Sequence, residues 1–438
     1  MNRILLLALL STGCLAASAQ KPARQEIMED LNRTATNLYA YPTPQGITYT
    51  KPPRGYKPFH ISAYARHGSR FHASADKYTY PLDALARADS AGRLTPLGRE
   101  VLLTIDTLYR MAHKRIGDLT QVGADQHRGI ARRMVRNYPE VFRGTVHVEA
   151  RSTPILRCVM SMANECMELK RLHPDMTLQC NASHHDYDYL NNHDSCLAHL
   201  YAQGQAAHSF REYSRRTVHP DRLMAALFND PQYVSEHVNQ QELMPYLFSM
   251  AAIVQNLDLT PQEADRYNLY RIFTPDECFD LWKRWNYRWY LRHAFSPLTH
   301  NEVPYMEAHL LRNIILTADT CLASGRRNVT LRFGHDINVM PLACLLHLDD
   351  YAFSSDDPDA VAEHWRSYKI TPKATNLQFV FYRRKGAPDM VKVLLNEEEM
   401  RMPLDSPHAP YYYWSDFRKY CEDILHKADE VLHKYQSR

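Results

Sequence analysis

The chain has 438 residues, of which 45% are apolar and 23% are charged, a composition that excludes wholesale disorder. Its 52 basic and 49 acidic residues leave a net charge of +3, too balanced for a protein that coats nucleic acid, so no nucleic-acid partner is expected. Any affinity for anions must therefore come from a local cluster of charges. No internal apolar run reaches the roughly 18 residues of a membrane span, so none is expected.

Residues 1–19 have the pattern of a secretory signal peptide. A positive start at Arg3 precedes the apolar run 4–10, and Ala17-Ser18-Ala19 fits the small-residue cleavage pattern. We therefore expect an exported protein, either periplasmic or secreted. The alternative is a lipid anchor on Cys14, which ranks second because Ser11 stands where a leucine is usual in lipidated signals.

Eight cysteines remain after this segment: Cys158, Cys166, Cys180, Cys196, Cys278, Cys321, Cys344 and Cys421. An even number of cysteines in an exported chain predicts disulfides, although spacing does not give their pairing. Cys158 and Cys166 are expected about 12 Å apart on one helix, so they should not pair with each other. No Cys-x-x-Cys motif occurs, so neither a zinc ribbon nor a thioredoxin-like redox site is indicated.

In chain order, the predicted elements form an α/β core interrupted by helices. Strands are predicted over 57–65, 146–150, 328–333, 377–384 and 390–396, and helices over 95–110, 123–135, 154–172 and from 414 to the end. From about 198 to 320 the pattern is mostly helical. Thr95 and Thr120 are expected to cap the helices that follow them. This order predicts an α/β core, residues 20–157 and 321–438, with a mostly helical cap inserted over 158–320.

The most informative segment, Arg66-His67-Gly68-Ser69-Arg70, comes directly after the first predicted strand. Gly68 allows a sharp turn, and ligands of open α/β sheets bind just beyond the carboxyl ends of strands. Arginine presents N–H forks that match phosphate oxygens, and a neutral imidazole between two such forks can attack the phosphorus they hold. Taken alone, the segment is equally compatible with a solvated basic turn.

Two further segments follow predicted strands in the same way. Gly334-His335-Asp336-Ile337-Asn338 follows the strand 328–333, and its Asp336 could protonate a leaving oxygen while His335 donates to a phosphate oxygen. Arg157 falls near the start of the helix predicted over 154–172, where the helix dipole favours an anion. Structural alternatives are a capping aspartate with a structural histidine, and a surface arginine.

Together these segments resemble the histidine acid phosphatase family, clade 2 of the histidine phosphatase superfamily. The family's motifs R-H-G-x-R-x-P, R-S-T-x-x-x-R and G-H-D-x-N stand here at 66–72, 151–157 and 334–338, and its L-T-x-x-G run stands at 119–123, followed by Gln126 and His127. The resemblance spans about residues 57 to 395. His72 replaces the family's usual proline, which is nearer to the multiple inositol polyphosphate phosphatases, yet these usually have H-A-E where this chain has His335-Asp336.

The resemblance implies a phosphoglycerate-mutase-like α/β core sheet flanked by helices, with an inserted all-helical cap domain. It implies that His67 attacks a small-molecule phosphomonoester and becomes phosphohistidine, and that Asp336 protonates the departing alcohol. The implied holders of the phosphoryl oxygens are Arg66, Arg70, Arg157 and His335. Ser69, Asn338 and Lys77 are weaker candidates for the substrate pocket. No metal or other cofactor is expected. The reaction is expected to have an acid pH optimum.

Other patterns in the chain indicate rival sites. Cys278 to Arg284 has the C-x5-R spacing of cysteine-dependent phosphatases but lacks the glycine-rich loop that such chemistry needs. Asp186-Tyr187-Asp188 is similar to a haloacid-dehalogenase pair, but no apolar strand precedes it. The run 184–194 holds metal-capable side chains and is either a metal site or a polar loop. Lys283, Arg284, Arg288 and Arg292 form either a basic wall for a polyphosphorylated substrate or the wet side of a helix.

The sequence therefore predicts an exported phosphomonoester hydrolase of the histidine type, with phytate and a broad range of phosphomonoesters as competing substrate classes. The alternative is a non-catalytic phosphate or phosphosugar binding protein on the same fold. Joint presence of His67 and Asp336 argues against this alternative, because binding needs neither a nucleophile nor an acid. A metabolic mutase is disfavoured by the helical insertion and the predicted export signal.

Overall fold

The computed structural model describes residues 21–191, 195–326 and 328–436. The predicted signal peptide and Cys14 lie outside this part of the chain, so both remain predictions. One mixed sheet runs in the order β3-β2-β4-β1-β5-β6-β7, and β8 pairs with β6. The strands are β1 (Lys57–Arg66), β2 (His147–Ser152), β3 (Thr177–Ala182), β4 (Asn328–Gly334), β5 (Asn376–Arg383), β6 (Met390–Leu395), β7 (Glu398–Glu399) and β8 (Tyr412–Tyr413).

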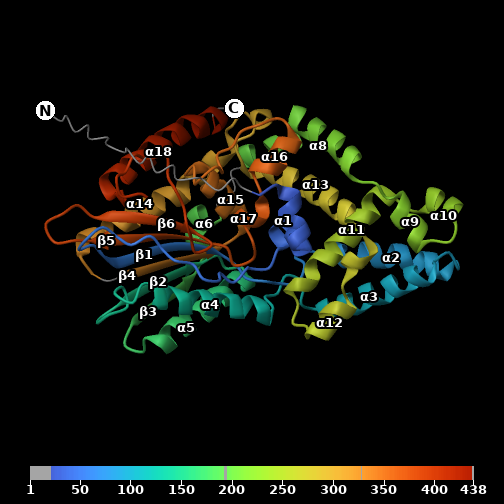
Figure 1. The fold of residues 1–438 in the computed structure, drawn as a ribbon, viewed down its shortest axis with the longest axis horizontal. Helices are drawn as coiled ribbons and strands as arrows, with labels where there is room; N and C mark the ends of the chain where they lie inside the picture. The colour runs from blue at the N-terminus through green and yellow to red at the C-terminus, as the bar shows by residue number, and fades with distance from the viewer. Residues whose placement is uncertain (1–20, 192–194, 327, 437–438) are drawn as a thin grey trace, which may run out of the picture.

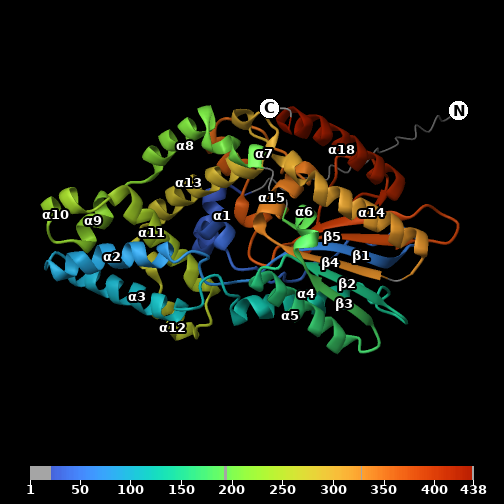
Figure 2. The same cartoon turned by 180° about the vertical axis from the view of Figure 1, so that it is seen from behind.

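Helices cover both faces of this sheet, as Figures 1 and 2 show. On one face lie α4 (Gln121–Asn137) and α5 (Leu156–Leu172), and on the other lie α14 (Ala308–Ser324), α15 (Asp336–Leu345) and α18 (Trp414–Gln436). Alternating residues of β5 explain this arrangement. Leu377, Phe379 and Phe381 join the apolar cluster of α14, α15 and α18, whereas Val380 and Tyr382 join that of α4 and α5.

A second body of helices extends beyond one end of the sheet (Figure 1). It holds α2 (Asp76–Ser90), α3 (Pro96–Ala112), α8 (Gly204–Thr217), α9 (Asp221–Leu227), α10 (Pro231–His237), α11 (Gln240–Ile253), α12 (Pro261–Arg266) and α13 (Pro275–His293). The other α-helices are α1 (Ala23–Glu29), α6 (Tyr187–Leu190), α7 (Ser195–His199), α16 (Pro358–His364) and α17 (Ser367–Ile370). We call the helices of the first list the cap. They confirm the predicted fold class of an α/β sheet with helical cap.

One cap helix belongs to two apolar clusters. Near its start, α13 places Cys278 and Leu281 in the cluster shared with α2, α3, α9 and α11. Near its end, Tyr287, Tyr290 and Leu291 join the cluster that covers the sheet. The cap is therefore fastened to the core by a continuous helix as well as by loops.

The predicted elements are found with small changes of bounds. Thr95 and Thr120 cap α3 and α4, each accepting a hydrogen bond from the backbone N–H three residues later. By contrast, α5 begins at Leu156 and not at Pro154. β3 was not predicted, because it is a largely exposed edge strand without apolar alternation.

The division of the chain at 157/158 and 320/321 stays a proposal. β3 extends the sheet next to β2, and α5 packs on that sheet, although both were assigned to the cap. Conversely, α2 and α3 lie with the cap helices and not with the core. The mostly helical character of the inserted region is otherwise as expected.

None of the eight cysteines is joined to another by a disulfide, so the predicted disulfides are not found. Four of them, Cys158, Cys278, Cys344 and Cys421, are buried at 0% exposure. Cys278 packs in the cap, whereas Cys344 and Cys421 pack among the residues above the sheet. A buried cysteine packs as a small apolar residue, and an even count in the sequence does not distinguish this role from pairing.

In the described parts, no helix is long and apolar enough to cross a membrane.

Candidate active site

The carboxyl ends of three parallel strands bring the predicted motifs together. β1 and β4 align Arg66 with Gly334, and β4 and β2 align Phe333 with Ser152. The residues that follow these strands therefore meet at one edge of the sheet. There the rings of His67 and His335 lie edge to face with their centroids 5.8 Å apart.

His67 is buried and held in one orientation. Its backbone N–H donates to the Gly334 carbonyl at 3.0 Å, and its Nδ1 lies 2.9 Å from the Gly68 carbonyl. Because a carbonyl only accepts, Nδ1 carries the proton and the lone pair of the neutral ring is on Nε2. Burial, followed by the charges of Arg66 and Arg157, lowers the pKa of His67 well below its usual value. The imidazole is therefore unprotonated even in mild acid, the state that a nucleophilic role would require.

Asp336 is the first residue of α15, and three donors hold its carboxylate. Oδ1 accepts from the Ile337 backbone N–H at 3.0 Å. Oδ2 lies 2.7 Å from a guanidinium nitrogen of Arg66 and accepts from the Asn37 side-chain amide at 2.7 Å. Burial acts to raise the pKa of Asp336, but Arg66, then Lys373 and Asn37, lower it far below its usual value. Asp336 is therefore ionised in this arrangement of the site.

Arg66 is fully buried and serves mainly the protein itself. Its Nη1 donates to the carbonyls of Asn37, Thr371 and Pro372 at 2.7, 2.9 and 3.1 Å, and its Nη2 faces Asp336. Its Nε and Nη2 have no hydrogen-bond partner in the described chain, although Nη2 is ion-paired with Asp336. The predicted phosphate-binding residue lies in the site, but it also orients the carboxylate.

Arg70, Arg157 and His335 surround His67 from other sides. Nη1 of Arg70 donates to its neighbour Phe71, while Nε of Arg70 and Nε of Arg157 are buried without a hydrogen-bond partner in the described chain. Arg157 lies in the first turn of α5, at its positive end. Burial, then Arg157, lowers the pKa of Arg70 to about 9, and the same two causes lower that of His335 to about 4. Two guanidinium groups and one neutral imidazole thus surround His67.

The three weaker pocket candidates are placed differently from one another. Ser69 is fully buried, where its hydroxyl donates to Asn256 and its backbone N–H donates to Gln126. Asn338 is also fully buried and donates to Glu307. Lys77 lines the cavity beside the site, although its ammonium group lies over the Tyr246 ring. Ser69 and Asn338 thus stabilise the loops, and Lys77 alone of the three borders open space.

His72, where the family usually has proline, ties the motif loop to the cap. Its Nε2 lies 3.1 Å from the Ser249 carbonyl of α11 and its backbone N–H donates to the Tyr78 hydroxyl. Burial, followed by Arg70 and Lys373, lowers the pKa of His72 to about 3. The ring is therefore neutral and donates to the cap helix.

The L-T-x-x-G run packs directly against the R-H-G loop. A Cβ on Gly68 would lie 2.7 Å from Gly123 Cα, and a Cβ on Gly123 would lie 2.6 Å from the Ser69 backbone nitrogen. Both distances are shorter than real carbon contacts. The two glycines are thus required because two backbones touch behind the nucleophile.

We expect Gly123→Ala to displace the loop that carries His67 and to destabilise the fold by at least about 1–3 kcal/mol, since neither backbone can yield easily. Thermal unfolding and phosphatase rate would measure both effects. Gly129→Ala, on the same helix, is the control, because its Cβ would meet only the guanidinium end of the Arg133 side chain and no backbone. Equal melting temperatures for the two variants would contradict the close approach.

Sequence analysis missed two residues of this site, Asn37 and Lys373. Asn37 donates to Asp336 and accepts from Arg66, and it follows Thr36, whose backbone (φ 52°, ψ −118°) is unfavourable for a side-chain-bearing residue. Lys373 is fully buried, and its Nζ has no hydrogen-bond partner in the described chain. Neither residue stands in a recognisable motif. The only sequence signal was a lysine in the otherwise uncharged run 370–381.

A cavity of about 270 Å³ opens beside the nucleophile and carries an excess of positive charge. Basic side chains from two sides line it: Arg70, Lys77, Arg288 and Arg292. Arg292 lies over the rings of Tyr201 and Trp289, and Arg288 lies over Phe210, with no carboxylate paired to either in the described chain. Arg288 and Arg292 of the predicted basic wall therefore border the cavity, whereas Lys283 pairs with Asp280 and Arg284 donates to Ser214.

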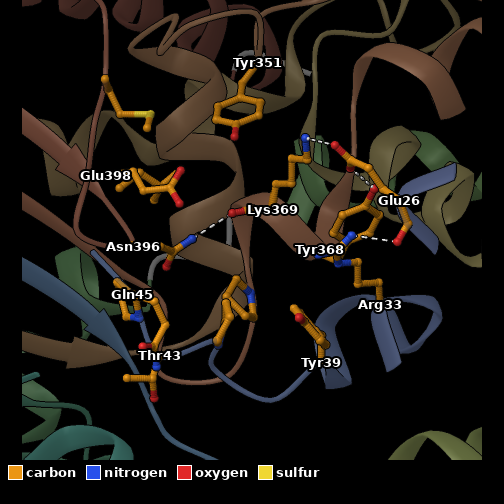
Figure 3. Close-up of a pocket in the computed structure, with 15 residues that line it drawn as sticks. Glu26, Arg33, Tyr39, Thr43, Gln45, Tyr351, Tyr368, Lys369, Asn396 and Glu398 are labelled. Carbon is orange, nitrogen blue, oxygen red and sulfur yellow. Dashed lines mark hydrogen bonds and ion pairs between the residues drawn. The ribbon is translucent and has the colours of Figure 1, made fainter. Parts of the chain in front are cut away.

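A second cavity, of about 420 Å³, lies behind the site and holds none of the predicted site residues (Figure 3). Its charged groups are largely satisfied by one another, since Glu26 binds Lys369 at 2.7 Å and accepts from Tyr368 at 2.6 Å. Pro372, one residue before Lys373, forms part of its wall.

The rival patterns find no support among the described residues. Cys278 is buried in α13, so the C-x5-R run is helical and forms no phosphate loop. Asp186 lies 3.5 Å from Arg151 and accepts from the Tyr189 hydroxyl. No cluster of three metal-capable side chains occurs in 21–191, 195–326 or 328–436, and His193 and Asp194 of the run 184–194 lie outside these ranges.

Comparisons with known proteins give a consistent result at the level of structure. Multiple inositol polyphosphate phosphatase from Bifidobacterium longum, solved with inositol hexasulfate, superposes with a TM-score of 0.76 over 89% of this chain and 97% of its own, at 17% identity. The fold of the chain is that of this phosphatase. A D. castellii phytase gives a TM-score of 0.61 over 95% and 90% at 14% identity, and the Hafnia alvei phytase gives 0.52 over 86% and 99% at 14%.

Scans against models of protein families and against curated sequences found no match. The fold that the resemblance to histidine acid phosphatases implied is therefore found, since it is the fold of an inositol polyphosphate phosphatase and of phytases.

Proposed function

We propose that the chain is an exported phosphomonoester hydrolase that forms a phosphohistidine on His67 and acts on inositol polyphosphates such as phytate. The observation that carries the proposal is the meeting of a neutral, oriented imidazole with Asp336 and the forks of Arg70 and Arg157 at one sheet edge. Binding alone requires no such nucleophile. The comparison structures add that the same fold serves a phosphatase and phytases.

In the first step, Nε2 of His67 attacks phosphorus while the bond to the alcohol oxygen breaks, and Asp336 gives that oxygen a proton. The guanidinium groups of Arg66, Arg70 and Arg157, together with His335, donate to the phosphoryl oxygens and stabilise the charge of the transition state. In the second step, water attacks the phosphohistidine, Asp336 takes the proton of the water, and phosphate leaves. The guanidinium groups supply the positive charge that the reaction needs.

The substrate class follows from the basic cavity beside the nucleophile. Arg288 and Arg292 place two guanidinium groups there without a carboxylate partner in the described chain, which favours a substrate with additional phosphates. The purified chain should release phosphate from phytate and from an aryl phosphate. If the rate on phytate is as low as that of a catalytically dead variant, inositol polyphosphates are excluded as substrates.

The double variant Arg288→Ala/Arg292→Ala should lower kcat/KM for phytate by roughly 10- to 100-fold, the effect of lost charged hydrogen bonds, and leave an aryl phosphate within about threefold. Steady-state kinetics on both substrates measures the contrast. Arg216→Ala is the control, since Arg216 lies on cap helix α8, paired with Asp359 and outside the cavity. Parallel losses on both substrates would show that the stripe plays no part in specificity.

A further inference from the structure

Lys373 combines complete burial with an unsatisfied ammonium group. Its exposure is 0%, and its Nζ has no hydrogen-bond partner in the described chain. A buried lysine without a partner is costly unless a ligand or ion satisfies it. Packing of the core does not explain why the Lys373 ammonium group is buried without a partner.

The backbone around Lys373 is built into the site. Its own N–H donates to the Tyr39 carbonyl at 2.7 Å, and the N–H of Ala374 donates to the His67 carbonyl at 3.1 Å. Ala374 has φ of 54°, the left-handed region that side-chain-bearing residues avoid, and strain of this kind gathers at functional sites. Arg66 holds the two preceding carbonyls, Thr371 and Pro372. The lysine is thus fixed next to the nucleophile by several contacts.

Lys373 interacts electrostatically with the titratable groups of the site. These are Arg66 from β1, His67, Arg70 and His72 from the loop after β1, Arg157 from α5 and Asp336 from α15. Burial, then Arg66 and Arg70, lowers the pKa of Lys373 well below its usual value. With Lys373 protonated and Asp336 ionised, the four cations and one anion leave three positive charges. A phosphoryl dianion would compensate most of this charge.

We propose that Lys373 is a further catalytic residue, whose Nζ donates to an oxygen of the phosphoryl group held at His67. The proposal rests on the proposed function and adds a fourth cation to its three arginines. Lys373 would also lower the pKa of Asp336 in the complex, since it is one of the largest charged influences on that carboxylate. Substrate binding thereby satisfies the otherwise unpaired ammonium group.

The test compares Lys373→Met and Lys373→Arg with Lys369→Met in the purified chain. Methionine keeps the length of the side chain and removes a buried unpaired charge, so the variant should still fold. Inorganic phosphate, titrated by calorimetry, should bind roughly 10- to 100-fold more weakly to Lys373→Met, whereas Lys373→Arg should recover most of the affinity. Lys369, four residues earlier and paired with Glu26, is the matched control and should change affinity less than twofold.

The pH profile separates a catalytic role from a structural one. Turnover of an alkyl phosphate requires protonated Asp336, so kcat falls as pH rises through the pKa of Asp336 in the complex. Loss of the Lys373 charge raises that pKa, and the fall in kcat should move to higher pH in Lys373→Met. Unchanged phosphate affinity, or a lower rate with an unmoved profile, would overturn the proposal.

The outcomes also distinguish the two proposals. If the unmodified chain hydrolyses no phosphomonoester but loses phosphate affinity through Lys373→Met, the proposed function fails and the phosphate contact stands. If hydrolysis is rapid and the Lys373 variants behave like the control, only the inference about Lys373 fails.

Discussion

Replacing His67 by alanine should lower turnover by about 10⁴- to 10⁶-fold, the scale at which loss of a catalytic nucleophile is usually felt. In the proposed reaction His67 forms the covalent intermediate, because its Nδ1 proton is fixed by the Gly68 carbonyl and Nε2 holds the free lone pair. Denaturing the chain in alkali during turnover of ³²P-labelled substrate should trap label on the unmodified protein, since phosphohistidine survives base, and none on His67→Ala.

His335→Ala is the natural control for this experiment, because its ring lies beside that of His67 but is assigned only a donor role. It should slow turnover and still accumulate label. Inorganic phosphate should bind to His67→Ala, since Arg70 and Arg157 remain. Label trapped on His67→Ala would show that another residue is the nucleophile.

Replacing Asp336 by asparagine should lower kcat for an alkyl phosphate such as phytate by about 10²- to 10⁴-fold, the usual contribution of a general acid. Asparagine preserves the shape that Arg66 and Asn37 hold, but it carries no transferable proton. A nitrophenyl phosphate, whose leaving group departs without protonation, should lose far less. The ratio of the two losses, from steady-state kinetics on both substrates, is the measurement.

The low pKa of Asp336 also changes how the acid optimum arises. Because the pKa of Asp336 is low, the carboxylate is ionised before the substrate binds, so the proposed reaction requires a substrate that brings the proton, a phosphate monoanion. Phosphate monoesters lose that proton near about pH 6, and kcat/KM should fall as pH rises through this value. On the acid side, His67 stays neutral below its usual pKa, so activity should persist well below about pH 6.5.

Asn37→Leu serves as the companion variant for Asp336, because it removes one donor to the carboxylate without altering the acid itself. Similar losses for Asp336→Asn on the alkyl and the nitrophenyl substrate would contradict the assignment of the general acid.

Much of this site could be predicted because its parts follow strands in sequence. The ends of β1 and β4 are marked by glycines next to histidines, and parallel pairing forces such ends together. Capping threonines likewise marked the starts of α3 and α4. These are local signals, and local signals are what a single sequence carries.

Other parts had no local signal. Asn37 reaches Asp336 across 299 residues from an irregular helical turn, and Lys373 arrives on a strained loop before β5. β3 is an exposed edge strand that lacks apolar alternation. The prediction of disulfides was wrong because the number of cysteines in a sequence does not distinguish buried thiols from paired ones. The charge balance around Asp336 depends on all these positions together, and so could not be derived before the structure.

The double membership of α13 has a consequence for selectivity. Because α13 packs in the cap at one end and above the sheet at the other, the distances from Arg288 and Arg292 to His67 are fixed by the fold. We therefore expect the protein to select phosphorylated rings by the distance between their phosphates. We also expect little closure of the cap on the core when a substrate binds.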